Sequence, residues 1–231
     1  MEFDIVEIAK HMSLPVKIIS ILMILMSVYS FYVIFERIIT FRAASDQSIR
    51  YVQMLGEFLR TNKVNDALAA ARSMGKSPVA KVMESGLTAL VQGREAQTLQ
   101  GPHDVGNFDL VDSVNRALER VKERETSNLR KGLPYLGTVA SATPFIGLLG
   151  TVIGIISAFQ LLKGGAAIDV IGPAIAEALI ATAVGLAVAI VAAMAFNFFA
   201  TRVEGFVVDM NDVSSEFIDY VLREGRDSNK A

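Results

Sequence analysis

The sequence predicts an all-α membrane protein with three transmembrane helices, two of them extended into the cytoplasm, and a helical cytoplasmic domain. Of the 231 residues, 52% are hydrophobic, and these residues gather in three uninterrupted blocks instead of spreading as a soluble core requires. Each block is long enough to cross a hydrocarbon core of roughly 30 Å at roughly 1.5 Å per helical residue. The blocks are expected to be helices, because lipid offers no partner to an open strand edge.

The elements are assigned in chain order from these apolar blocks. The first block is expected to be a retained anchor, because the residues before it are acidic and no small-x-small cleavage site follows it. The resulting division is a periplasmic N-terminal segment (1–15), transmembrane helix 1 (16–36), a cytoplasmic helical domain (37–132), transmembrane helix 2 (133–162), a short periplasmic loop (163–170), transmembrane helix 3 (171–200) and a cytoplasmic C-terminal helix and tail (201–231).

The orientation follows from the basic residues beside each block. Arg37 and Arg42 follow the first block, and Arg130 and Lys131 precede the second, whereas only Lys163 follows the second. Basic residues next to a span favour its cytoplasmic side. We therefore expect a multi-pass membrane protein whose Arg42–Arg130 segment and C-terminal tail are cytoplasmic and whose N-terminus lies outside the cytoplasm.

The segment between the first two blocks carries apolar residues at helical spacing. Gln92–Asn107 holds three glycines and a proline and is interpreted as a loop. Phe108–Lys131 is dense in charge with a thin apolar stripe, which predicts a solvated helix that runs directly into the second span. Val203–Arg223 is expected to continue the third span in the same way. The shorter helices are expected at Ile49–Arg60, Val64–Met74 and Pro78–Val91.

Two spans carry stripes of small residues. Such residues let helix backbones approach closely, which is how helices associate when lipid removes the hydrophobic driving force. The stripes are either seams between helices of one chain or contacts between copies, and their width favours a ring-forming oligomer. Pro144 and Pro173 are interpreted as helix starts or kinks. The helix-packing residues are Gly147, Gly150 and Gly154 in the second span and Ala178, Ala181, Gly185 and Ala189 in the third.

Several function classes are excluded. Gly75-Lys76-Ser77 resembles the end of a phosphate-binding loop, but the position of the required earlier glycine is Ala70. His11 and His103 have no acidic cluster at ligand spacing nearby, so no metal site is expected. The chain has no cysteine, no nucleophile with a base at a recognisable spacing, and no basic stripe with aromatic residues. We therefore expect no enzyme, no cofactor and no nucleic-acid partner, and membrane lipids as the surroundings.

Glu177 is the carboxyl group of the third span. Counted from Ile171, it lies roughly 10 Å inside the apolar block. A charged group facing lipid there costs at least ~2.5 kcal/mol. Two interpretations stay open: an interfacial or helix-bonded glutamate near the start of the helix, or a group that lines an ion path. Thr182 lies about 140° further round the helix, so the two side chains occupy different faces.

Two long motifs carry a family resemblance. GPAIAEALIATAVGLAVAI (Gly172–Ile190) and TPFIGLLGTVIGIISAFQ (Thr143–Gln160) are similar to the ExbB/TolQ family, relatives of the flagellar stator protein MotA. The resemblance covers nearly the whole chain and is closest in motif to TolQ. One departure is Val191, where the family often has proline.

The resemblance implies a mechanism. Family members form a ring, typically of five copies, around a dimer of single-span partners resembling ExbD or TolR, whose membrane aspartate carries the ion. The ring supplies polar groups matching Thr151, Thr182 and Glu177. The translocated ion is expected to be H⁺, with Na⁺ as the alternative, and its flow is expected to rotate the ring about the partner.

The function implied is a force-generating channel subunit that serves envelope integrity, outer-membrane uptake or gliding motility, with a TonB/TolA-like or motility protein as a further partner. Two alternatives stay open. One is a channel or transporter without mechanical output, and the other is a membrane scaffold that uses its spans only for assembly.

Overall fold

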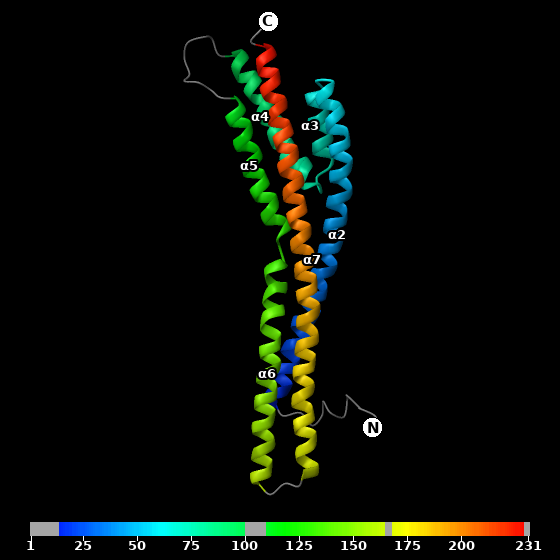
Figure 1. Ribbon diagram of the computed structural model, residues 1–231, viewed down its shortest axis with the longest axis vertical. Helices are drawn as coiled ribbons and strands as arrows, with labels where there is room; N and C mark the ends of the chain where they lie inside the picture. Colours follow the sequence, from blue (N-terminus) through cyan, green and yellow to red (C-terminus); the bar gives the residue numbers. More distant parts are fainter. Residues whose placement is uncertain (1–13, 100–109, 165–167, 229–231) are drawn as a thin grey trace. The chain divides into compact units, whose positions relative to one another are not determined.

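The computed structural model describes residues 14–99, 110–164 and 168–228 (Figure 1). Both histidines, His11 and His103, lie outside the described residues, as does most of the predicted N-terminal segment. The described part of the chain is helical and contains no strand, which confirms the all-α part of the predicted fold class. Its helices are α2 (Leu14–Arg60), α3 (Val64–Ser73), α4 (Pro78–Leu99), α5 (Leu110–Leu129), α6 (Leu133–Lys163) and α7 (Ile168–Ser228).

Three helical stretches are long and apolar enough to cross a membrane, as the sequence predicts. They lie within Leu14–Arg60, Leu110–Lys163 and Ile171–Glu224. Large apolar side chains in these stretches, such as Phe31 and Phe145, are exposed. A soluble fold would bury side chains of this size, so their exposure fits helices that face lipid or other proteins.

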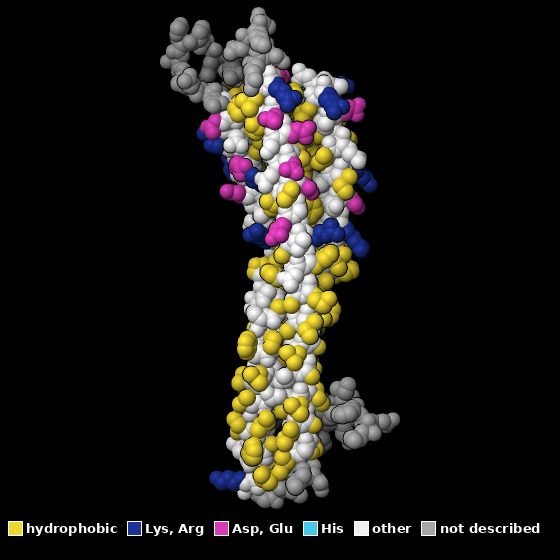
Figure 2. Space-filling view, in the orientation of Figure 1, with side chains coloured by type: hydrophobic (Ala, Val, Ile, Leu, Met, Phe, Trp, Pro, Cys, Tyr) yellow, Lys and Arg dark blue, Asp and Glu magenta, His cyan; other side chains and the backbone are white. Residues whose placement is uncertain are grey.

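The chain divides into two units. The apolar unit comprises Met1–Glu36 and Gly132–Phe199, and the charged unit comprises Arg37–Lys131 and Ala200–Ala231. Figure 2 shows hydrophobic side chains over the apolar unit and most of the charged side chains over the charged unit. The charged unit therefore combines the predicted helical domain with the C-terminal half of α7.

Two helix boundaries correct the sequence analysis. The helix expected over Phe108–Lys131 does not run directly into the second span, because α5 ends at Leu129 and α6 begins at Leu133. Gly132 stands in the turn with φ 79°, a left-handed conformation that glycine adopts without a steric penalty. The third span does continue through Val203–Arg223, as expected, because α7 is one helix from Ile168 to Ser228. Helix α2 is continuous as well, and it includes the segment expected to form a separate helix at Ile49–Arg60.

A third boundary corrects the loop assigned to Gln92–Asn107. Helix α4 continues to Leu99, with Gly93 inside it. A single glycine costs a helix only about 1 kcal/mol relative to alanine, and the arginine, glutamate and alanine that follow it are good helix formers. Residues 100–107 of the predicted loop lie outside the described residues.

Neither predicted proline position starts a helix. Pro144 lies inside α6, and Pro173 lies inside α7, which begins at Ile168. Proline removes one backbone hydrogen bond and strains the preceding turn, so a bend at either position stays a prediction. Pro134, in contrast, lies in the first turn of α6. A backbone N–H in the first turn has no acceptor within the helix, so proline there costs no hydrogen bond.

The core of the charged unit forms where α4, α5 and α7 meet. A Cβ atom on Gly86 would lie 2.5 Å from Leu118 Cδ2 and 3.0 Å from Phe217 Cε1, so these side chains of α5 and α7 pack directly on the backbone of α4. Helix α2 joins the same unit through Phe41, whose ring stacks on that of Phe206 at 5.8 Å between centroids. The unit is thus a bundle of four helices with α3 packed against α4.

Candidate functional site

The predicted site lies in the apolar unit, where α6 and α7 pack through small residues. A Cβ on Gly185 would lie 2.7 Å from the carbonyl oxygen of Thr143, and one on Gly154 would lie 2.5 Å from the Cβ of Ala178. A Cβ on Gly147 would lie 3.0 Å from the Cα of Thr182. The two backbones are therefore in direct contact, as small residues in neighbouring spans allow.

Helix α2 covers the same contact. Val16, Ile19 and Met23 form a buried cluster with Ala181 of α7. A Cβ on Gly150 would meet both Ala181 Cβ at 3.3 Å and Ile19 Cγ2 at 3.6 Å. The apolar unit is thus a three-helix contact with Ala181 near its centre.

The small-residue stripes are consequently used inside one chain. All seven predicted helix-packing residues are buried without a second copy present. The sequence-based argument that their width exceeds the needs of one chain is therefore wrong, and these residues give no support to a ring. They are Gly147, Gly150, Gly154, Ala178, Ala181, Gly185 and Ala189.

Glu177 lies at this contact and not on the lipid-facing surface. Its exposed fraction is 6%, and neighbouring Ala178 is fully buried. Glu177 is one helical turn before Ala181 and shares its face of α7, the face that meets the α2 cluster. Thr151 of α6 is buried to a similar degree, with 7% exposed. The structure thus encloses both polar side chains among apolar helices.

The two predicted threonines use their hydroxyl groups differently. Thr182 Oγ1 donates to the carbonyl oxygen of Gly147 at 2.8 Å and so links α7 to α6. Thr151 Oγ1 donates to the carbonyl oxygen of Leu148 at 2.7 Å within its own helix. Each hydroxyl oxygen keeps lone pairs that can accept a hydrogen bond or contact an ion.

Thr143 is a buried polar residue of the same contact that sequence reasoning missed. It is fully buried, and its hydroxyl donates to the carbonyl oxygen of Val139 at 2.7 Å. Its own carbonyl oxygen is the atom closest to the position of a Cβ on Gly185. The spacing from Gly147 gives the signal, since Thr143, Gly147, Gly150 and Gly154 follow one another at steps of three and four residues.

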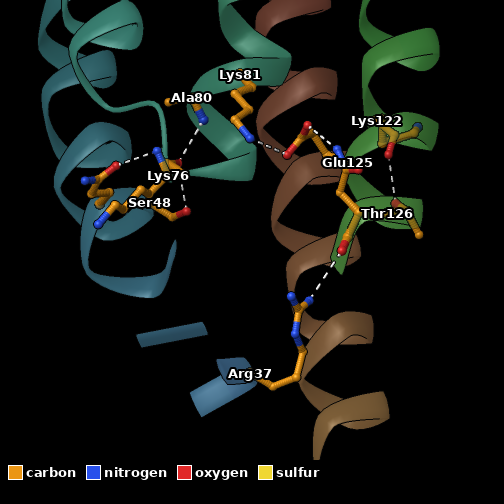
Figure 3. A network of polar contacts seen from close by, with 11 residues as sticks. Arg37, Ser48, Lys76, Ala80, Lys81, Lys122, Glu125 and Thr126 are labelled. Atoms are coloured by element: carbon orange, nitrogen blue, oxygen red, sulfur yellow. Dashed lines mark hydrogen bonds and ion pairs between the residues drawn. The ribbon is translucent and has the colours of Figure 1, made fainter. Parts of the chain in front are cut away.

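A polar network in the charged unit was also missed (Figure 3). Buried Arg37 of α2 donates from Nη1 to the carbonyl oxygens of Asn128 and Leu129, both at 3.4 Å. These carbonyls end α5, where the negative end of the helix dipole favours a cation. Arg37 therefore caps α5 immediately before the turn at Gly132.

Glu125 is the second buried charge of the network. It accepts a hydrogen bond from Lys81 Nζ at 2.8 Å, which joins α5 to α4, and one from Asn128 Nδ2 at 2.9 Å within α5 (Figure 3). The sequence holds a signal for it, because Glu125 occupies the position between Val121 and Leu129 in the apolar stripe of α5. A buried carboxylate in such a position needs a paired cation.

The start of α4 is fixed by Ser77. Its Oγ accepts the backbone N–H of Ala80 at 2.9 Å, as a residue that caps a helix N-terminus does, and Pro78 follows it. Ser77 Oγ also shares a hydrogen bond of 2.8 Å with Ser48 Oγ of α2. In the sequence, Gly75-Lys76-Ser77 resembled a phosphate loop, and the structure gives Ser77 this capping contact.

The described residues contain no group of three or more histidine, aspartate or glutamate side chains that could hold a metal ion.

The profile of the MotA/TolQ/ExbB proton channel family matches residues 75–212, which is more than half of the chain and includes Thr151, Glu177 and Thr182. This chain belongs to the MotA/TolQ/ExbB proton channel family.

Individual relatives agree with the family match. The chain is 31% identical to the Tol-Pal system protein TolQ of Pseudomonas aeruginosa over 89% of this chain and 87% of that protein. It is 30% identical to the biopolymer transport protein ExbB of Salmonella typhimurium over 94% of this chain and 85% of that protein. It is 42% identical to the TolQ of Haemophilus influenzae, but that match spans 50% of this chain and 51% of the relative.

Proposed function

We propose that this protein is the channel subunit of an ion-driven motor in the bacterial inner membrane, with its N-terminus in the periplasm and its C-terminus in the cytoplasm. Copies form a closed ring, five in the expected number, around a dimer of ExbD/TolR-like single-span partners. The assembly converts the proton-motive force into mechanical work on the cell envelope. Membership of the proton channel family supports H⁺ as the ion, and similarity to TolQ and ExbB proteins supports an envelope process.

The observation that carries the proposal is the enclosed carboxyl group of Glu177. A glutamate with 6% of its surface exposed, between apolar helices, is costly to keep and is by default a functional group in a membrane span. In the proposed assembly, the partner and the ring enclose water beside α6 and α7, and Glu177 then relays the ion.

The threonine hydroxyls fit the same role. Thr151 and Thr182 each donate their hydroxyl proton to a backbone carbonyl oxygen, with Oγ1 to O distances of 2.7 Å and 2.8 Å. Their oxygens therefore present lone pairs, which suit a hydrated proton or a sodium ion equally. These contacts support an ion pathway past the two threonines.

The proposal is tested by ion flux. The full chain, with the single-span protein that co-purifies with it, is reconstituted in liposomes that hold a pH-sensitive dye, and a pH gradient and membrane potential are imposed. We expect internal acidification only when both proteins are present. Flux through the chain alone would favour a channel without mechanical output. A partner complex that carries neither H⁺ nor Na⁺ would overturn the proposal in favour of a scaffold.

A further inference from the structure

The four long helices of the charged unit form a closed cycle of neighbours. Ser48 of α2 bonds to Ser77 beside α4, and Lys81 of α4 bonds to Glu125 of α5. Helices α5 and α7 line a common groove, and α7 returns to α2 through the stacked rings of Phe41 and Phe206. In Figure 1, α5 and α2 lie on either side of α7 within this unit. The groove between α4 and α5 is therefore on the opposite side from the groove between α2 and α7.

The α4/α5 groove carries unpaired positive charge. It encloses about 900 Å³ and contains three basic and two acidic side chains. Lys81 is paired with Glu125, and Glu84 is paired with Arg72 at 3.4 Å. Arg120 and Arg124 are exposed, lie one turn apart, and make no ion pair with any described residue of the chain. This groove therefore presents two free guanidinium groups on one helix face.

The α2/α7 groove carries the opposite charge. It encloses about 390 Å³, and its charged lining residues are Asp209, Asp212 and Glu216 of α7. Steps of three and four residues place the three carboxylates on one helix face. They too form no ion pair within the described part of the chain. Burial, and then the negative charge of Asp212, raise the pKa of Asp209, so a nearby cation would relieve an unfavourable site.

We propose that the α4/α5 groove of one copy binds the acidic α7 face of the next copy, with Arg120 and Arg124 opposite Asp209, Asp212 and Glu216. The inference rests on the proposed ring and names the surface that closes it. Because the two grooves lie on opposite sides, each copy has one neighbour on each side, and such head-to-tail contacts form a ring when the rotation between neighbours closes. In a two-fold symmetric pair, the same groove of both copies would meet, and this would bring like charges together.

The positions along the chain agree with a lateral contact in one membrane. Arg124 lies nine residues before Leu133, the first residue of α6. Asp209 lies nine residues after Ala200, where the third apolar block ends. In both cases, nine positions along the chain separate a residue of the charged set from the apolar block.

Disulfide cross-linking tests the contact directly, because the chain contains no cysteine. The full chain with Arg124→Cys and Asp212→Cys is oxidised in membranes and run on a non-reducing gel. We expect a ladder that ends at the size of the ring, whereas each single variant stays monomeric. A matched control carries Arg116→Cys with Asp212→Cys, because Arg116 is exposed on α5, paired with Asp112 and outside the groove. The control should give no ladder.

Charge reversal provides a second measurement, which does not require two cysteines to lie at the distance and orientation that a disulfide needs. Arg120→Glu with Arg124→Glu should weaken each contact by roughly 2- to 30-fold, since exposed ion pairs contribute modestly. Asp209→Lys with Asp212→Lys should do the same, and the four changes together should restore the ring. Circular dichroism of each variant checks that the helices are retained.

The failure of this inference is distinguishable from failure of the proposed function. A closed ring of the unmodified chain in native mass spectrometry, combined with no ladder and no effect of charge reversal, would overturn the groove contact and leave the motor proposal intact. A chain that stays monomeric in membranes would overturn both.

Discussion

Gly185→Ala probes the contact between α6 and α7 with a single methyl group. A Cβ at position 185 would lie 2.7 Å from the carbonyl oxygen of Thr143 and 3.2 Å from the Cα of Gly147. Ordinary van der Waals contact begins at 3.4 Å, so the backbone of α6 must move by several tenths of an ångström. Both atoms belong to the backbone of a helix and cannot rotate away. Overpacking of this kind costs roughly 1–3 kcal/mol.

The matched control is Gly205→Ala on the same helix, where a Cβ would meet nothing within 4 Å. Alanine is about 1 kcal/mol better than glycine inside a helix, and the control removes this gain from the comparison. Thermal unfolding in detergent should place Gly185→Ala below Gly205→Ala by roughly 2–4 °C per kcal/mol for a chain of this size. Equal unfolding temperatures would refute the close backbone contact.

Three further predictions concern single hydrogen-bonding groups. Arg37→Met should destabilise the charged unit by about 1.5–3 kcal/mol, because one buried and one partly buried carbonyl lose a charged donor. Arg42→Met, at an exposed position, should change stability by less than about 0.5 kcal/mol. Ser77→Ala should cost about 1 kcal/mol through loss of the α4 cap, and the check is reduced protection of the first amides of α4 in hydrogen exchange. Thr182→Val keeps the volume but removes the bond to Gly147; unfolding in detergent should show a loss of about 0.5–1.5 kcal/mol, and an unchanged midpoint would contradict the α6–α7 link.

The sequence predicted the features that depend on local pattern. Three long apolar blocks and their helical spacing required three spans, and small residues at steps of three and four predicted close helix contacts. The sequence left open whether Glu177 is interfacial or lines an ion path, and its burial is a finding of the structure. These predictions need only the period of a helix and the cost of exposing polar groups to lipid.

Features that depend on distant partners were not predictable in the same way. Nothing in the local pattern states whether Gly154 packs against Ala178 of its own chain or against another copy, and the structure places the contact within the chain. Arg37 and Leu129 are 92 residues apart, so the cap on α5 appears only after folding. The break at Gly132 was missed because one glycine in a helical pattern is compatible with either a continuous helix or a turn.

The central claim is that Glu177 belongs to an ion pathway. The most direct test is partner-dependent proton flux in liposomes with Glu177→Gln, since glutamine keeps the shape and hydrogen bonding of the side chain but cannot titrate. Native mass spectrometry on the same sample verifies that the assembly is unchanged. The account predicts that Glu177→Gln loses proton flux while the assembly stays intact. Glu177→Ala should give the same result. Flux equal to that of the unmodified protein in both variants would contradict it and would leave Glu177 a structural group of the α2–α6–α7 contact.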